Sequence, residues 1–174
     1  MLSDFNLLAT TPRRNEREAC DELRHLLTEL GDPNPEVEKT HISGLVAVKT
    51  SLNPFETVKR LRQILIERPY ELRFTLRVIP IEKVIQTDLV EIELAAAELA
   101  SEIGEDETFR VTLEKRFSAT PTQSIIEAAA SNIKQKVNLE KPDKILLIEV
   151  VGGLTGMSLI RPDDILSVVK EKML

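Results

Sequence analysis

Two hydrophobic periods alternate along this chain. The first is the two-residue period of a strand with one buried face, and "FRVTLEKR" (109–116) shows it clearly, since Phe109, Val111 and Leu113 alternate with polar residues. The second is the helical spacing of three or four residues, which runs from Ala19 to Leu30 and stops at Gly31. Their succession predicts strands and helices in alternation.

Residues 1–84 predict the order βαββαβ. "FNLLAT" is a short strand before the helix that ends at Gly31, and "VEKTHISGLVAVKT" supplies two further strands. Asn53-Pro54 has the N-cap and first-turn proline of a second helix, and the alternation from Leu72 to Val78 predicts a closing strand. This order is typical of a ferredoxin-like unit of about 80 residues.

Residues 85–174 predict a second, α/β domain. Its elements are an amphipathic helix over 88–103, the strand 109–116, a helix that begins at Thr120-Pro121, the apolar strand "KILLIEVV", the short strand "MSLI" and a terminal helix over 163–173. Gln123 completes a predicted capping box with Thr120, and the buried stripe of that helix is expected at Ile126, Ala129, Ile133 and Val137. The chain is therefore expected to be an α+β protein with domains at 1–84 and 85–174.

Charge is distributed unevenly along the 174 residues. The net charge is −6 and the pI is near 5.1, which at first argues against nucleic acid. Residues 88–107, however, hold eight acids and no base, whereas residues 108–174 hold ten bases and eight acids. The chain can thus be acidic overall and keep a basic face elsewhere.

Catalytic and metal-binding groups are not evident in the sequence. Cys20 is interpreted as a small buried hydrophobe, and no paired ligand spacing accompanies His25 or His41. "VVGGLTG" lacks the spacing of a phosphate loop and is interpreted as a turn. We expect no catalytic residue, metal or cofactor, and the lack of a leader or a long apolar run leads us to expect a cytoplasmic protein without a membrane segment.

Basic residues of the second half form the remaining candidate site. Lys115 and Arg116 end a strand just before a helix N-terminus, where free N–H groups can bind a phosphate. Lys134 and Lys136 are expected on the same helix, and Arg161 follows the last strand. From the residues alone, RNA binding and a plain solvated surface remain equally open.

Three stretches together resemble a known family. "FRVTLEKRFS", the helix after it and "VNLEKPDKILLIEVVGGLTGMSLI" resemble the THUMP domain, whose hallmark is a basic strand, a V-x-L-x-x-P-D entry into an apolar strand and a short closing strand. The ferredoxin-like unit before it and the "GMSLI" ending resemble the stand-alone THUMP proteins like Tan1, the THUMPD group. The resemblance is strongest over 108–160.

This resemblance implies a function. THUMP domains bind RNA, chiefly tRNA through its acceptor end, and proteins similar to Tan1 are non-catalytic tRNA-binding adaptors for the RNA cytidine acetyltransferase that makes N4-acetylcytidine. It implies tRNA and that acetyltransferase as partners, and no DNA. The residues expected at the RNA are Arg110, Lys115, Arg116, Lys134, Lys136, Gly156, Met157, Ser158 and Arg161, with possible additional contacts from Arg13, Arg14, Arg73 and Arg77.

Two other functions stay open. One is a tRNA-modification enzyme that acts alone, and the other is a ferredoxin-like module that binds a protein or small ligand without RNA. The acidic helix 88–107 is a candidate face for the acetyltransferase by charge complementarity.

Overall fold

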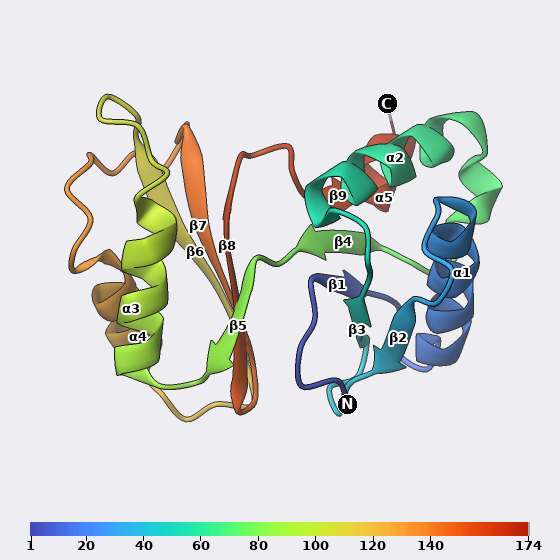
Figure 1. Cartoon of the computed structure of the whole chain (residues 1–174), viewed down its shortest axis with the longest axis horizontal. Coiled ribbons are helices and arrows are strands. Elements are labelled where there is room, and N and C mark those ends of the chain that lie inside the picture. Colours follow the sequence, from blue (N-terminus) through green and yellow to red (C-terminus); the bar gives the residue numbers. More distant parts are fainter. Residues whose placement is uncertain (174) are drawn as a thin grey trace. The chain divides into compact units, whose positions relative to one another are not determined.

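The computed structural model describes residues 1–173, which divide into two compact units. The first unit comprises Met1–Ile81 together with the C-terminal segment from Asp164, and the second is Glu82–Asp163. Figure 1 shows both units, each with one sheet and its own helices. The expected α+β architecture, a ferredoxin-like unit followed by an α/β domain, is confirmed.

The first unit has the predicted βαββαβ order. It consists of β1 (Leu7–Thr10), α1 (Glu16–Glu29), β2 (Glu36–Lys39), β3 (Leu45–Lys49), α2 (Pro54–Glu67) and β4 (Arg77–Pro80), with a short 3₁₀ turn, η1 (Pro69–Glu71), before β4. The antiparallel sheet has the order β2-β3-β1-β4-β9, so β1 is the central strand and is hydrogen-bonded to β3 on one side and β4 on the other. The apolar stripe of α1 predicted from the sequence packs on this sheet, with Leu23, Leu26 and Leu27 fully buried.

The C-terminal segment departs from the expected domain boundary. The sequence predicts it within the domain 85–174, but β9 (Leu166–Ser167) pairs antiparallel with β4, and α5 (Val168–Lys172) follows in the first unit. Leu166 and Val168 are buried in the first unit's core. Burial of one such side chain contributes about 1.5–3 kcal/mol. Pairing with the edge of β4 and burial of these two side chains therefore stabilise the C-terminal segment in the first unit. The single helix expected over 163–173 is reduced to α5.

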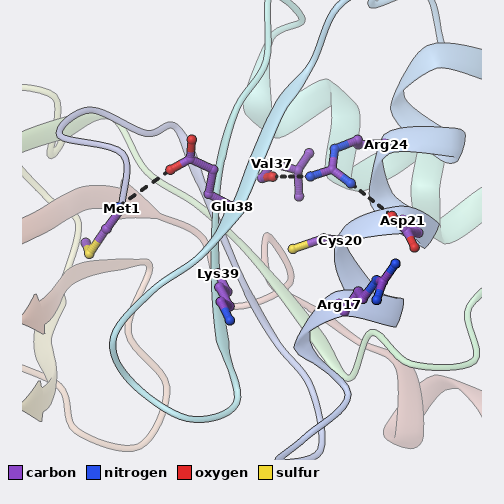
Figure 2. A pocket seen from close by; sticks show the side chains of 8 residues that line it. All are labelled: Met1, Arg17, Cys20, Asp21, Arg24, Val37, Glu38 and Lys39. Carbon is purple, nitrogen blue, oxygen red and sulfur yellow. Dashed lines mark hydrogen bonds and ion pairs between the residues drawn. The ribbon is translucent and has the colours of Figure 1, made fainter.

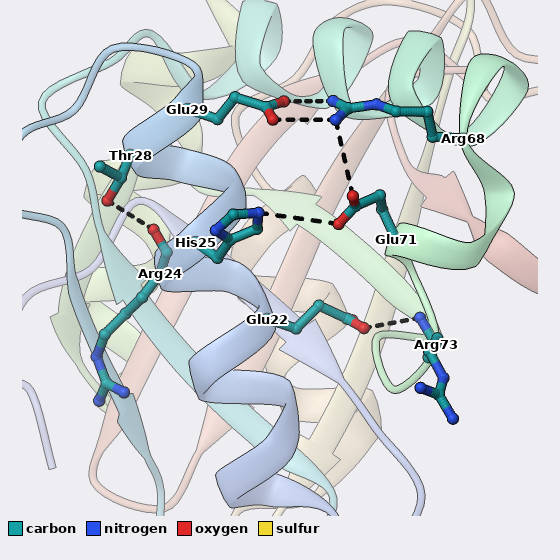
Figure 3. Close-up of polar contacts among 8 residues, drawn as sticks. All are labelled: Glu22, Arg24, His25, Thr28, Glu29, Arg68, Glu71 and Arg73. Atoms are coloured by element: carbon teal, nitrogen blue, oxygen red, sulfur yellow. Dashed lines mark hydrogen bonds and ion pairs between the residues drawn. The ribbon is translucent and has the colours of Figure 1, made fainter.

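The closing strand of the ferredoxin-like unit is shorter than the alternation from Leu72 to Val78 predicted. Glu22 on α1 accepts hydrogen bonds from the backbone N–H groups of Arg73 (2.7 Å), Phe74 (3.1 Å) and Thr75 (2.8 Å), and Figure 3 shows it reaching toward Arg73. Those three donors are therefore not used in a ladder, and β4 begins only at Arg77.

The second unit is a four-stranded sheet with two helices. Its elements are β5 (Lys83–Gln86), α3 (Leu89–Ala100), β6 (Phe109–Arg116), α4 (Thr122–Ala130), β7 (Lys144–Val151) and β8 (Leu154–Ile160), and its strand order is β5-β8-β7-β6. Only β6 and β7 are parallel, and α4 makes the crossover between them. The helices α3 and α4 lie side by side on one face of the sheet (Figure 1), where they share a core with β7.

Candidate nucleic-acid interface

The alternation along β6 sends its two terminal basic residues to opposite faces. Val111 and Leu113 pack into the core beneath α3 and α4, so odd-numbered side chains of β6 face the helices and even-numbered ones face away. Lys115 therefore lies on the helix face and Arg116 on the other. The two residues do not form the single phosphate-binding pair expected from the sequence.

Lys115 lies at the loop that leads into α4. Its Nζ donates to the carbonyl oxygen of Thr120 at 2.7 Å, just before the first turn of the helix. The capping box expected at Thr120 and Gln123 is wrong, because Pro121 occupies the N-cap, where a proline side chain cannot accept a hydrogen bond, and Gln123 donates to Glu127 instead. The first turn of α4 thus has no side-chain cap, and its N–H dipoles and the Lys115 ammonium can both stabilise an anion there.

Arg116 forms an ion pair inside the second unit. Its Nη1 donates to Oε2 of Glu149 at 2.7 Å, and the Glu149 side chain is fully buried while that of Arg116 is 19% exposed. A guanidinium committed to a buried carboxylate neutralises that charge. The predicted phosphate contact at Arg116 is accordingly replaced by a structural ion pair.

A second basic group lies at the opposite end of β6. The helix expected to carry Lys134 and Lys136 ends at Ala130, so both residues lie in the following loop, where they are exposed. This loop runs beside the start of β6, since the N–H of Phe109 donates to the carbonyl of Lys136 at 3.0 Å. Val137, expected in the buried stripe of that helix, is 59% exposed for the same reason.

Arg110 joins this second group. Its Nη1 donates to the carbonyl of Leu139 at 2.9 Å, which ties the guanidinium to the same loop. The exposed Arg161 follows Ile160, which pairs with Ile145, the register partner of Arg110. Arg110 and Lys115 are roughly 16 Å apart along the strand, so the predicted basic set forms two groups rather than one.

The closing motif lies inside the sheet. Met157 and Ser158 are fully buried on β8, Met157 in the core beneath the helices, and Ser158 donates to Glu82 at 3.2 Å. Gly156 is the register partner of Glu149 on the neighbouring strand β7. Direct RNA contact by the side chains of Met157 and Ser158, expected from the sequence, is therefore not compatible with their burial.

The four arginines named as possible additional contacts belong to the first unit. Arg13 and Arg14 are exposed between β1 and α1, and Arg14 has a positive φ of 78°. Arg73 is exposed with its guanidinium carbon 5.6 Å from the centroid of the Phe74 ring. Arg77 is half-buried at the start of β4. Arg13 and Arg14 are neighbours in the loop after β1, and Arg77 is the register partner of Thr10 at the end of β1.

A polar network connects α1 to the segment after α2 (Figure 3). Arg68 pairs with Glu29 and lies 3.7 Å from Glu71, whose Oε2 is 3.9 Å from His25 Nε2. The hydrogen bond from Arg68 holds the pKa of the Glu29 carboxyl below its usual value. His25 thus has an acidic neighbour in a surface network that connects structural elements.

A pocket of about 530 Å³ lies between α1 and β2, and Figure 2 shows its lining. Arg24 is engaged there by Asp21 at 3.0 Å and by the carbonyl of Val37 at 2.7 Å. Cys20 lines the pocket, and burial raises the pKa of its thiol. A protonated thiol is a poor nucleophile, which agrees with the interpretation of Cys20 as a small hydrophobe.

Residues 1–173 hold no group of three His, Cys, Asp or Glu placed to bind a metal ion. Within this range, no helix is long and apolar enough to cross a bilayer.

Phe117 is an exposed residue that the sequence reasoning passed over. It follows Arg116 directly, is 75% exposed and has a positive φ of 51°. The sequence offered no signal of this exposure, because position 117 continues the two-residue period of Val111 and Leu113 and so predicts a side chain on the buried face. The strand ends at Arg116 instead, and the positive φ of Phe117 turns the chain out of that register.

Comparisons with known proteins bear on the fold and on the second unit. Three solved structures share the fold. PH1313 from Pyrococcus horikoshii has a TM-score of 0.65 and 20% identity, over 89% of this chain and 54% of that one. TrmN from Thermus thermophilus has a TM-score of 0.53 and 16% identity over 90% and 46% of the two chains, and a 4-thiouridine synthetase in complex with RNA and ATP has a TM-score of 0.55 and 14% identity over 91% and 42%. The chain spans about half the length of these proteins. No curated protein matches it. Residues 86–160 match the family model of the THUMP domain, so this chain contains a THUMP domain within its second unit.

Proposed function

We propose that this protein binds tRNA through its THUMP domain. The observation that carries the proposal is the position of Lys115 within that domain, with its ammonium 2.7 Å from the Thr120 carbonyl and next to the uncapped first turn of α4. A lysine and a helix N-terminus together suit a backbone phosphate. A shared fold with a 4-thiouridine synthetase solved in complex with RNA supports the choice of ligand.

The second basic group is proposed to extend the footprint. Lys134 and Lys136 are exposed in the loop beside the start of β6, and Arg110 is anchored to the same loop. Two cationic groups roughly 16 Å apart can contact separate phosphates of one RNA strand or duplex. Arg116 is left out of this footprint because it neutralises Glu149.

The finer proposal is that the protein is a non-catalytic adaptor in the cytoplasm, which presents tRNA to an RNA cytidine acetyltransferase for N4-acetylcytidine formation. It rests on the resemblance to the stand-alone THUMP proteins. The acidic helix α3 is its proposed contact with the enzyme, since Glu91 is exposed on it and Glu102 is exposed just beyond its end. Val90 and Leu94 on α3 add exposed apolar surface at 62% and 64%.

Binding of unmodified tRNA at two salt concentrations tests the general proposal. Contacts with phosphates release counterions, so affinity should fall steeply as salt rises. If tRNA affinity does not change with salt, or tRNA does not bind, the alternative of a module that binds a protein or small ligand without RNA is favoured instead. Incubation with tRNA and acetyl-CoA then tests the adaptor role: acetylated cytidine should form only when the acetyltransferase is added, and product from this protein alone would make it an enzyme.

A further inference from the structure

The aromatic residues of this chain are few, and two of them, Phe117 and Tyr70, are exposed. The sequence has five Phe, one Tyr and no Trp. Phe5 and Phe109 lie in cores at 1% and 2% exposure, whereas Phe117 is 75% exposed at the end of β6. A phenylalanine ring gains by leaving water, so its exposure calls for a reason.

The backbone holds Phe117 in an unusual conformation. Its φ of 51° is in the left-handed region, which a bulky non-glycine residue rarely adopts. Both flanks of the loop are fixed, because the Arg116 carbonyl accepts from the N–H of Gly152 at 2.8 Å and Lys115 binds the Thr120 carbonyl at 2.7 Å. The ring is thus carried outward on a short loop that is tied to the sheet at each end.

We propose that Phe117 stacks on an unpaired nucleobase of the bound RNA, next to the phosphate that Lys115 contacts; this rests on the proposed function. An exposed ring beside a cation offers the two elements of single-strand recognition, a stacking platform and a charge for the backbone. The base must be unpaired, because bases within a duplex are already stacked on their neighbours. Phe117 therefore gives the site a preference for single-stranded nucleotides, because a positive charge alone does not distinguish single-stranded from double-stranded RNA.

The test compares tRNA affinity for four variants at one fixed salt concentration. Phe117→Leu keeps an apolar side chain without a π face and should bind unmodified tRNA about tenfold more weakly, whereas Phe117→Tyr should stay within about twofold of the wild type. Phe117→Gly suits the positive φ, so it should fold and still bind weakly. Tyr70→Leu is the matched control, because Tyr70 is also exposed, at 67%, and should leave affinity unchanged.

A blunt RNA duplex without unpaired ends separates stacking from other roles. Phe117→Leu should bind this duplex as the wild type does, because the duplex offers no free base. If Phe117→Leu loses affinity equally for tRNA and duplex, or loses none for tRNA, the stacking role is overturned. Salt-dependent tRNA binding by the wild type would in that case still support the proposed function. Absence of tRNA binding by the wild type would overturn both.

Discussion

Arg116 on β6 and the fully buried Glu149 on β7 are joined by an ion pair of 2.7 Å within the THUMP unit. Glu149 is the register partner of Gly156, so a residue of the closing motif lies next to the same carboxylate. Part of the family-like sequence pattern thus serves the internal electrostatics of the sheet rather than the surface.

Removal of Arg116 should therefore destabilise the fold. Arg116→Met leaves the Glu149 carboxylate buried without its guanidinium, and we expect the free energy of unfolding to fall by about 3 kcal/mol. Urea denaturation followed by circular dichroism measures this. The double variant Arg116→Met/Glu149→Leu should recover most of the loss, since an apolar pair can replace a buried ion pair. A loss below about 1 kcal/mol in the single variant would contradict the structural role.

Local patterns predicted most of the elements. Asn53 caps α2 by accepting from the N–H of Glu56 at 3.0 Å, and β6 covers the predicted residues 109–116. The signals there lie within a few residues, where propensity and period dominate. Alternation could also have placed Lys115 and Arg116 on opposite faces.

The remaining features depend on partners distant in sequence. The carboxylate of Glu22 takes the N–H groups of residues 73–75, and Leu166 reaches back to Val78 on β4. The loop that contains Lys136 pairs with Phe109 where a continued helix was expected. No local pattern encodes such contacts, so the sequence did not show that the basic residues lie in two groups.

Asp32 should give the first unit an acid-sensitive stability. Burial alone would raise the pKa of Asp32, but hydrogen bonds from Thr50 Oγ1 (2.6 Å) and the N–H groups of Ser51 and Asn34 (both 3.0 Å) outweigh it and hold the pKa below its usual value. A carboxyl with a lowered folded-state pKa stabilises the protein above its unfolded pKa of about 3.9, and this stabilisation is lost as the pH falls through the lower, folded-state pKa.

Asp32→Asn tests this directly. At pH 7 the variant should lose roughly 1–3 kcal/mol of unfolding free energy, because an amide oxygen is a weaker acceptor than a carboxylate. The difference from the wild type should narrow below about pH 4. Thermal unfolding of both proteins over a pH series measures it, and a gap that stays constant down to about pH 2 would contradict the assignment.

The acidic face of α3 can be tested separately from RNA binding. Glu91→Lys/Glu102→Lys should weaken affinity for the acetyltransferase by about tenfold and leave tRNA affinity intact or slightly raised. Glu98 is avoided because it pairs with Lys83 at 2.8 Å. The control Glu18→Lys/Glu36→Lys changes the charge equally at exposed acids of the first unit. Unchanged binding to the enzyme in a purified two-component assay would rule out this face.

The most direct test of phosphate binding at the THUMP domain is the affinity of Lys115→Ala for unmodified tRNA at two salt concentrations. Lys170→Ala is the control, since Lys170 is an exposed lysine of α5 in the first unit. We predict weaker binding by Lys115→Ala and a salt dependence reduced by about one phosphate contact, with Lys170→Ala like the wild type. Equal affinities and equal salt slopes for all three proteins would contradict the assignment of the phosphate site to Lys115.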